Sequence, residues 1–240
     1  MKLIIAGASG YVATEVVQQS LRMKEIHTVV ALARKPVVAS SGVSPAEAAK
    51  LRSVVIDDYE TYPEHTRREF EGADACIWTV SITPTKAHLP FQPWDEVQRV
   101  CQKCTLAGFR AMVESSPARP FRFLYMSGDK AERDQTKKPV VYPAYLLLRG
   151  ETENQVLAFA ASQQPQGTVE ACIARPAMIT GHRTYWQTVA GAAMRWSPVA
   201  TVTVEEVAAA MLQQVRDGFE KETLSNNDLK RIGSEVLKTL

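Results

Sequence analysis

Short apolar runs alternate with longer amphipathic stretches along most of the chain. Six runs have the length and the β-branched or aromatic content of buried strands, at residues 2–6, 27–33, 53–56, 74–80, 121–126 and 168–174. Between them, apolar residues recur at helical spacing, as over residues 10–21, where Val12, Val16 and Leu21 share one face. The same spacing predicts further helices at residues 46–51, 95–113, 144–161, 205–216 and 229–237.

Strands separated by helices at this spacing predict βαβ units and a parallel sheet. With right-handed crossovers the fold class is α/β, an open doubly wound parallel sheet of the Rossmann type. No linker marks a boundary, so residues 1–240 are interpreted as one dinucleotide-binding domain. Residues 176–203 break the alternation and are rich in Trp, Tyr, Met and His. They predict a small substrate-binding extension after the sixth strand.

Composition narrows the classes of function. The 240 residues carry 28 basic and 26 acidic side chains, a net charge of +2, which gives no electrostatic reason to expect nucleic acid or a membrane surface. No apolar run approaches the length of a membrane span, and the first residues lack the features of a signal peptide. Cys101 and Cys104 form a C-x-x-C pair inside a helical pattern, without the further ligands of a zinc site. We expect ordinary helix cysteines, no metal, and the reducing cytoplasm.

The first strand runs into a glycine turn, Gly7-Ala8-Ser9-Gly10-Tyr11-Val12-Ala13, that opens the first helix. Glycine can adopt the backbone angles of a sharp turn because it has no Cβ. Backbone N–H groups at the helix N-terminus that follows attract anions. Gly7 and Gly10 meet these needs, and Ala13 allows close helix–strand packing. The spacing is G-x-x-G-x-x-A and not the strict dinucleotide fingerprint G-x-G-x-x-G. The main evidence for a dinucleotide site is therefore the position of the turn, between the first strand and the first helix. The turn predicts a pyrophosphate site that includes Ser9, Tyr11 and Val12; the alternative is a purely structural turn.

The end of the second strand bears on the choice of coenzyme. NAD-binding folds often place an acidic residue there, on the ribose 2′-hydroxyl. This chain has Arg34 and Lys35 instead. The planar donor fork of arginine suits a 2′-phosphate, so we predict NADP(H) over NAD(H). A solvated loop charge at Arg34 is the alternative.

Several segments then follow in a characteristic order. They are GASGYVA at residues 7–13, Asp57 and Ser127 after the third and fifth strands, YLLLRGE at 145–151, RPAMITG at 175–181 and VEEVA at 204–208. On these segments the chain resembles the short-chain dehydrogenase/reductase superfamily over roughly residues 1–215. More narrowly, it is similar to the atypical or extended members, the NmrA-like proteins and the Tat-interacting oxidoreductase-like proteins.

The resemblance implies a catalytic serine and a tyrosine–lysine pair four residues apart on one helix. Ser127 and Tyr145 match these positions, whereas Arg149 stands in place of the lysine. Residues four apart share a helix face, so Arg149 would bond the nicotinamide ribose and favour the phenolate of Tyr145. Arginine does not exchange a proton near neutral pH, which puts a proton relay through it in doubt. Tyr145 as a core residue and Tyr142 as a competing donor are the alternatives.

The resemblance also assigns contacts to the coenzyme. Asp57 would meet the adenine amino group, although it is also a typical turn residue. Thr79, Val80 and Ser81, after the fourth strand, would line a ribose. The backbone after Pro176 would meet the nicotinamide carboxamide.

These residues predict an NADPH-dependent reduction of a carbonyl in a small aromatic or polyketide-like molecule, with Tyr145 as general acid and Ser127 on the carbonyl oxygen. The substrate pocket is expected from aromatic residues in irregular segments, namely Phe91, Trp94, His182, Tyr185 and Trp186. Scattered surface or core positions are the alternative for these residues. Two alternative functions stay open, namely a dinucleotide-binding regulator without turnover and a non-redox isomerase or cyclase on the same fold. Outer helices of such a sheet can also pair in a homodimer, although no pattern requires it.

Overall fold

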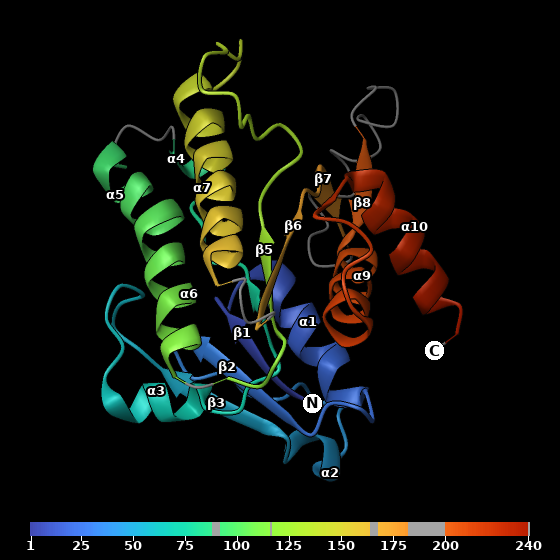
Figure 1. Cartoon of the computed structure of the whole chain (residues 1–240). Helices are drawn as coiled ribbons and strands as arrows, with labels where there is room; N and C mark the ends of the chain where they lie inside the picture. Colours follow the sequence, from blue (N-terminus) through green and yellow to red (C-terminus); the bar gives the residue numbers. More distant parts are fainter. Residues whose placement is uncertain (88–91, 116, 164–167, 182–199, 240) are drawn as a thin grey trace.

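The computed structural model describes residues 1–87, 92–115, 117–163, 168–181 and 200–239. One sheet of parallel strands runs through it in the order β3-β2-β1-β4-β5-β6-β9 (Figure 1). The strands are β1 Lys2–Ala6, β2 Thr28–Ala33, β3 Leu51–Val55, β4 Ala75–Trp78, β5 Phe121–Met126, β6 Val169–Ala174 and β9 Thr223–Leu224. The order reverses between β1 and β4, as in doubly wound nucleotide-binding sheets. The predicted fold class is confirmed.

Helices cover both faces of the sheet (Figure 1). On one face lie α3 Glu64–Phe70, α5 Trp94–Gln98, the π-helical turn η1 Arg99–Lys103, α6 Cys104–Glu114 and α7 Pro143–Ser162. On the other lie α1 Tyr11–Arg22, α9 Val204–Asp217 and α10 Asn226–Leu237. Two short helices, α2 Pro45–Ala48 and α4 Pro84–Ala87, lie in connections.

The strands read as continuous apolar runs because both of their faces are buried. Side chains alternate along β1, so Leu3 and Ile5 enter the core beneath α1 and α9, while Ile4 and Ala6 enter the core beneath α6 and α7. A third, smaller cluster joins α4, α5 and η1 to the start of α7. This third cluster contains Tyr145.

The structure differs from the predicted elements in several places, among them the short helix α4, which the sequence pattern did not predict. The helix expected over 95–113 is divided by η1, whose π-helical turn inserts an extra residue without a signal in the apolar spacing. Helix α3 and strand β9 were not predicted, because both are short. Within residues 176–203, Met178–Thr180 (β7) and Thr201–Thr203 (β8) pair as a separate small parallel sheet. Because β7 follows β6 directly, this pair lies beyond the carboxyl ends of the strands, where the extension was expected.

Candidate functional site

The glycine turn after β1 requires glycine at its first position. Gly7 has φ +80, a left-handed conformation that favours glycine. Its N–H and that of Ala8 both donate to the Leu32 carbonyl, at 3.0 and 3.1 Å, and Gly10 N–H donates to the Gly7 carbonyl at 2.8 Å. The turn is therefore fixed by backbone bonds and leaves Ser9 and Gly10 exposed on its outer side.

The N-terminus of α1 lacks the side-chain cap that α2, α9 and α10 carry, as do those of α3, α5, α6 and α7. Ser44, Thr203 and Ser225 cap α2, α9 and α10 with side-chain oxygens in capping boxes. Helix α1 instead starts at Gly10, with no side-chain cap and no acidic residue in its first turn. Its first N–H groups and the positive end of its dipole are thus available to an external anion.

Strand β4 ends directly beside this turn. A Cβ on Gly7 would lie 2.7 Å from the Thr79 hydroxyl oxygen and 3.2 Å from the Val80 nitrogen, so these predicted residues lie together. Val12 is buried and Ala13 is fully buried against the sheet, which gives the close packing expected at that position. Tyr11 reaches the RPAMITG segment, because a Cβ on Gly181 would lie 2.4 Å from the Tyr11 hydroxyl. Two segments that are 170 residues apart in sequence therefore meet at one end of the sheet.

The residues predicted at the adenosine end are on the surface. Arg34, Lys35 and Asp57 follow β2 and β3 and are exposed. Tyr59, which the sequence did not single out, packs beneath them and donates to the Leu32 carbonyl at 3.2 Å. Burial raises the pKa of Tyr59 to about 12, so its hydroxyl remains protonated and supports the turn as a donor.

An ion-pair cluster lies near Arg34. Arg99, in η1, pairs with Asp58 at 2.9 Å, with Glu60 at 3.2 Å and with Glu96 at 2.7 Å. The charge of Arg34 acts on Glu96 as well, since both Arg99 and, to a smaller degree, Arg34 lower the pKa of that carboxyl. Three carboxylates around one guanidinium leave excess negative charge here, which opposes the attraction of Arg34 for a phosphate.

Helix α7 directs three polar side chains toward the protein interior. Tyr145, Arg149 and Glu153 follow one another at intervals of four, so they share one face. They are 5%, 3% and 0% exposed. The sequence identified the first two from the family pattern, whereas Glu153 was missed.

Arg149 is held by the ends of two strands. Its Nη1 donates to the Ser81 hydroxyl at 3.0 Å, and its Nη2 donates to the Met126 carbonyl at 2.7 Å. Its guanidinium carbon also lies 4.9 Å from the centre of the Tyr125 ring, which is cation–π distance. The side chain thus bridges the segment after β4 and the end of β5.

Tyr145 lies in the small apolar cluster with Val97, Cys101 and Leu148. Its hydroxyl donates to the Ile82 carbonyl at 2.9 Å. Burial raises the pKa of Tyr145, while the charge of Arg149 and a hydrogen bond with Ser81 act in the opposite direction. The phenol is therefore protonated near neutral pH, as a general acid must be before it transfers its proton.

Ser127 and Pro176 lie side by side where β5 and β6 end. Ser127 N–H donates to the Ala174 carbonyl at 2.8 Å, and Asp129 N–H donates to the Pro176 carbonyl at 3.0 Å, which extends the strand pairing into the loops. The Ser127 hydroxyl oxygen is buried and has no hydrogen-bond partner within the described parts of the chain. Such a hydroxyl is suited to bonding a ligand atom.

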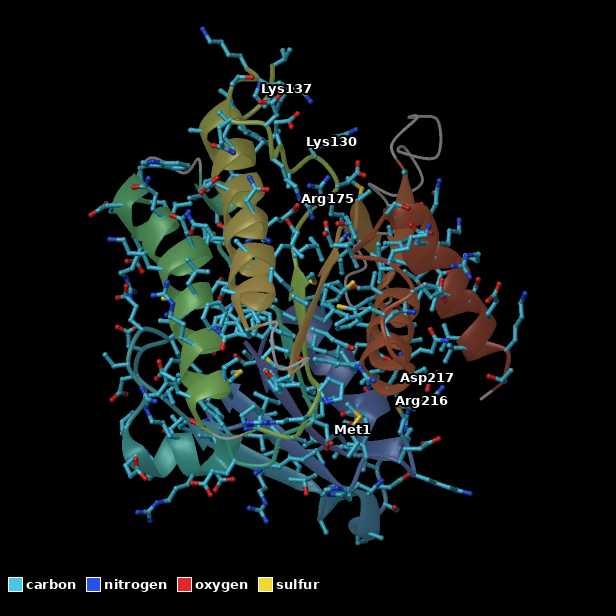
Figure 2. All side chains as sticks on the ribbon, viewed as in Figure 1. Met1, Lys130, Lys137, Arg175, Arg216 and Asp217 are labelled. Carbon is cyan, nitrogen blue, oxygen red and sulfur yellow. The ribbon has the colours of Figure 1, made fainter. Side chains whose placement is uncertain are left out.

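Glu153 fixes the start of the RPAMITG segment. Its carboxylate accepts from Arg133 Nε at 2.7 Å and from Arg175 Nε at 2.9 Å, and Arg175 Nη2 also bonds it. Figure 2 labels Arg175, which is seen between α7 and β7. An acidic residue four positions beyond Arg149 on a buried face was the available signal for this ion-pair cluster.

Gly150, next to Arg149 on α7, allows the loop after β5 to pass close to this helix. A Cβ there would lie 1.8 Å from the Glu132 carbonyl oxygen, so the loop after β5 passes directly over the helix. Glu132 N–H donates to the Leu146 carbonyl at 3.0 Å across the same contact. Glycine at this position lets the loop of Ser127 approach the helix of Tyr145.

Part of the predicted substrate side is described. Trp94 begins α5 and is 37% exposed. Phe91, His182, Tyr185 and Trp186 lie outside the described residues. A groove of about 800 Å³ opens elsewhere, between the start of β6 and the end of α9, and none of the predicted site residues lines it.

No described helix has the length and apolar character needed to cross a membrane. Within the described residues, no group of three or more His, Cys, Asp or Glu side chains is arranged to hold a metal ion. All four cysteines, including Cys101 and Cys104, are buried free thiols.

No family model and no curated protein matches this chain. Among solved structures, a yeast methylglyoxal/isovaleraldehyde reductase complexed with NADPH is similar, with a TM-score of 0.67 and 15% identity over 94% of this chain and 77% of the other. A Bacillus cereus UDP-glucuronic acid 4-epimerase variant in complex with NAD gives the same TM-score and coverages at 10% identity. The dTDP-glucose 4,6-dehydratase DesIV from Streptomyces venezuelae, with NAD bound, gives a TM-score of 0.66 at 14% identity over 99% and 81%.

At these identities the likeness establishes the fold. The chain has the same doubly wound Rossmann-type fold as these reductases, epimerases and dehydratases, as the sequence predicted. Membership of the short-chain dehydrogenase/reductase superfamily stays a prediction from the sequence segments. The narrower likeness to the NmrA-like proteins stays a prediction.

Proposed function

We propose that the protein is an NADP(H)-dependent oxidoreductase that reduces a carbonyl group of a small molecule, aromatic or polyketide-like in character. The observation that carries the proposal is the uncapped N-terminus of α1 behind Gly7 and Gly10, at the point where the strand order reverses. Solved neighbours with NADPH or NAD bound share this fold, which supports a nicotinamide dinucleotide as the coenzyme.

The residues present fit such a coenzyme. Ser9 and Gly10 are exposed, so the side of the turn that would bind an anion is open. A Cβ at Gly7 would instead collide with the Thr79 hydroxyl. Arg34 is exposed after β2, where it would contact a 2′-phosphate. Asp57, Thr79, Val80 and the backbone after Pro176 would line the rest of the molecule.

When bound, the coenzyme supplies the hydride. Tyr145 would donate its hydroxyl proton to the carbonyl oxygen, because this phenol is protonated near neutral pH. Ser127 would hydrogen-bond the same oxygen with the hydroxyl that has no partner in the described structure. Arg149 would act on Tyr145 by its charge.

The test is NADPH oxidation with a panel of aromatic and polyketide-like ketones, comparing the wild type with Tyr145→Phe and with Tyr142→Phe as the matched control. We expect at least a hundredfold loss of turnover in Tyr145→Phe and near-normal turnover in Tyr142→Phe. Undiminished turnover in Tyr145→Phe would eliminate the proposed acid.

A dinucleotide-binding regulator without turnover is the second candidate. The observation that favours it is the engagement of Tyr145 with the Ile82 carbonyl and of Arg149 with Ser81 and Met126. Tight NADPH binding without reaction on any carbonyl, together with a co-purifying protein partner, would support this function. A product of unchanged oxidation state would instead indicate an isomerase or cyclase.

Two further expectations accompany the proposal. The cytoplasm is the expected compartment, since buried free thiols suit a reducing environment. A homodimer through the outer helices is a prediction that sedimentation analysis would check.

A further inference from the structure

The guanidinium of Arg149 is buried and engaged by two protein acceptors. Its two terminal nitrogens donate to Ser81 and to the Met126 carbonyl. Its charge acts on the phenol of Tyr145 directly, and a second route of hydrogen bonds also connects the two side chains.

That route runs through Ser81 and its neighbour Ile82. The Ser81 hydroxyl accepts from Arg149 at 3.0 Å and donates its own proton to the Ile82 carbonyl at 3.2 Å. Tyr145 donates to that same Ile82 carbonyl at 2.9 Å. The guanidinium of Arg149 and the phenol of Tyr145 therefore form hydrogen bonds with consecutive residues after β4, Ser81 and Ile82.

The π-helical turn fixes these two residues from the other side. Cys101, in η1, accepts from Ile82 N–H at 3.4 Å and lies 3.5 Å from the Ser81 hydroxyl oxygen. A π-helical turn redirects side chains within a helix, and here it places the Cys101 thiol against the Ser81–Ile82 segment. Ser81 is thus held between a cation and a thiol.

We propose that Ser81 is a positioning residue that couples the charge of Arg149 to the phenol of Tyr145. Ser81 and Tyr145 both donate to the Ile82 carbonyl, so when Tyr145 gives up its proton the Ser81 hydroxyl can rotate its own proton from that carbonyl to the neighbouring phenolate, while its oxygen still accepts from Arg149. Burial raises the pKa of Tyr145, and the charge of Arg149 and then the hydroxyl of Ser81 act against that rise, in agreement with this arrangement. The inference rests on the proposed role of Tyr145 as an acid.

The arrangement also accounts for arginine at this position. The planar fork of arginine donates to Ser81 and to the Met126 carbonyl at the same time, from two different nitrogens. The single ammonium of a lysine has one nitrogen for both acceptors. Arg149→Lys would therefore retain the charge and weaken the connection through Ser81.

The experiment is a pH titration of the Tyr145 phenol by NMR, in full-length protein with isotope-labelled tyrosine and without substrate. The Tyr145 signal is assigned with Tyr145→Phe. We expect Ser81→Ala to raise the apparent pKa by about one unit, which is a tenfold change in the ionisation equilibrium. Ser81→Thr keeps the hydroxyl and should restore the wild-type value. Ser162→Ala, at the far end of α7, is the matched control and should change nothing.

An unchanged titration in Ser81→Ala, with a raised pKa in Arg149→Gln, would show that arginine acts only directly and would overturn the proposal. If Ser81→Ala does not fold, Arg149→Lys gives the second test, because a titration identical to that of wild type would equally contradict the coupling. NADPH binding, measured separately on the same variants, distinguishes a failure of the proposed function from a failure of the role assigned to Ser81. Absent coenzyme binding would refute the proposed function, whereas the phenol titration decides the role of Ser81.

Discussion

The buried carboxylate of Glu153 offers a quantitative prediction about stability. It is fully buried and bonds two guanidinium groups, those of Arg133 and Arg175, whose side chains are 28% and 21% exposed. Removing one partner of a buried ion pair costs about 3–5 kcal/mol. Because both arginines keep some contact with water, we expect Glu153→Gln to lose about 3 kcal/mol, near the lower end of that range.

Thermal and chemical denaturation would measure this loss. For a chain of this size, each kcal/mol shifts the Tm by about 2–4 °C, so we expect a decrease of about 6–12 °C. Glu170→Gln is the control, because Glu170 pairs with Arg122 at 3.1 Å on the surface and is 43% exposed. That substitution should cost less than about 1 kcal/mol. Equal losses in the two variants would refute the structural role assigned to Glu153.

Three further predictions concern other elements. Gly150→Ala should destabilise the fold by about 3 kcal/mol or more in denaturation, since its Cβ would overlap the Glu132 backbone, whereas Gly128→Ala, with open space around it, should be nearly neutral. Gly10→Ala should cost under about 1 kcal/mol of stability, because Gly10 has an ordinary φ, but should lower NADPH affinity at least about tenfold in calorimetry, because the added Cβ would meet the proposed pyrophosphate. Unaltered affinity would contradict the pyrophosphate site. Hydrogen bonds from Lys221, then Ser225, lower the pKa of Asp228 to about 2, so its contribution to stability is present above pH ~4 and is lost as pH falls toward ~2. Asp228→Asn should flatten stability over that pH window, and an unchanged pH profile would show that the carboxylate does not stabilise α10.

The architecture followed from the apolar pattern because buried parallel strands and amphipathic helices leave strong periodic signals. The glycine turn was equally visible, since only a residue such as Gly7 adopts φ +80 beside Thr79 without strain. Helix α7 was predicted within one residue at each end, and its interval of four placed Tyr145 and Arg149 on one face, as observed.

The contacts of these side chains could not be predicted. Helical spacing shows which face Arg149 occupies, but the acceptors at Ser81 and Met126 come from two strands 45 residues apart. The turn η1 was invisible, because a single inserted residue hardly alters apolar spacing over a long helix. Glu153 was missed because a carboxylate is normally exposed, and its partners Arg133 and Arg175 lie about 20 residues away on either side.

The most direct test of the central claim is a calorimetric titration of the purified protein with NADPH and with NADH. A dinucleotide bound at the β1–α1 turn predicts saturable binding of one coenzyme per chain, with NADPH at least about tenfold tighter and that preference lost in Arg34→Ala. Binding of both coenzymes with equal affinity would contradict the assignment of Arg34. Binding of neither would contradict the account of the glycine turn itself.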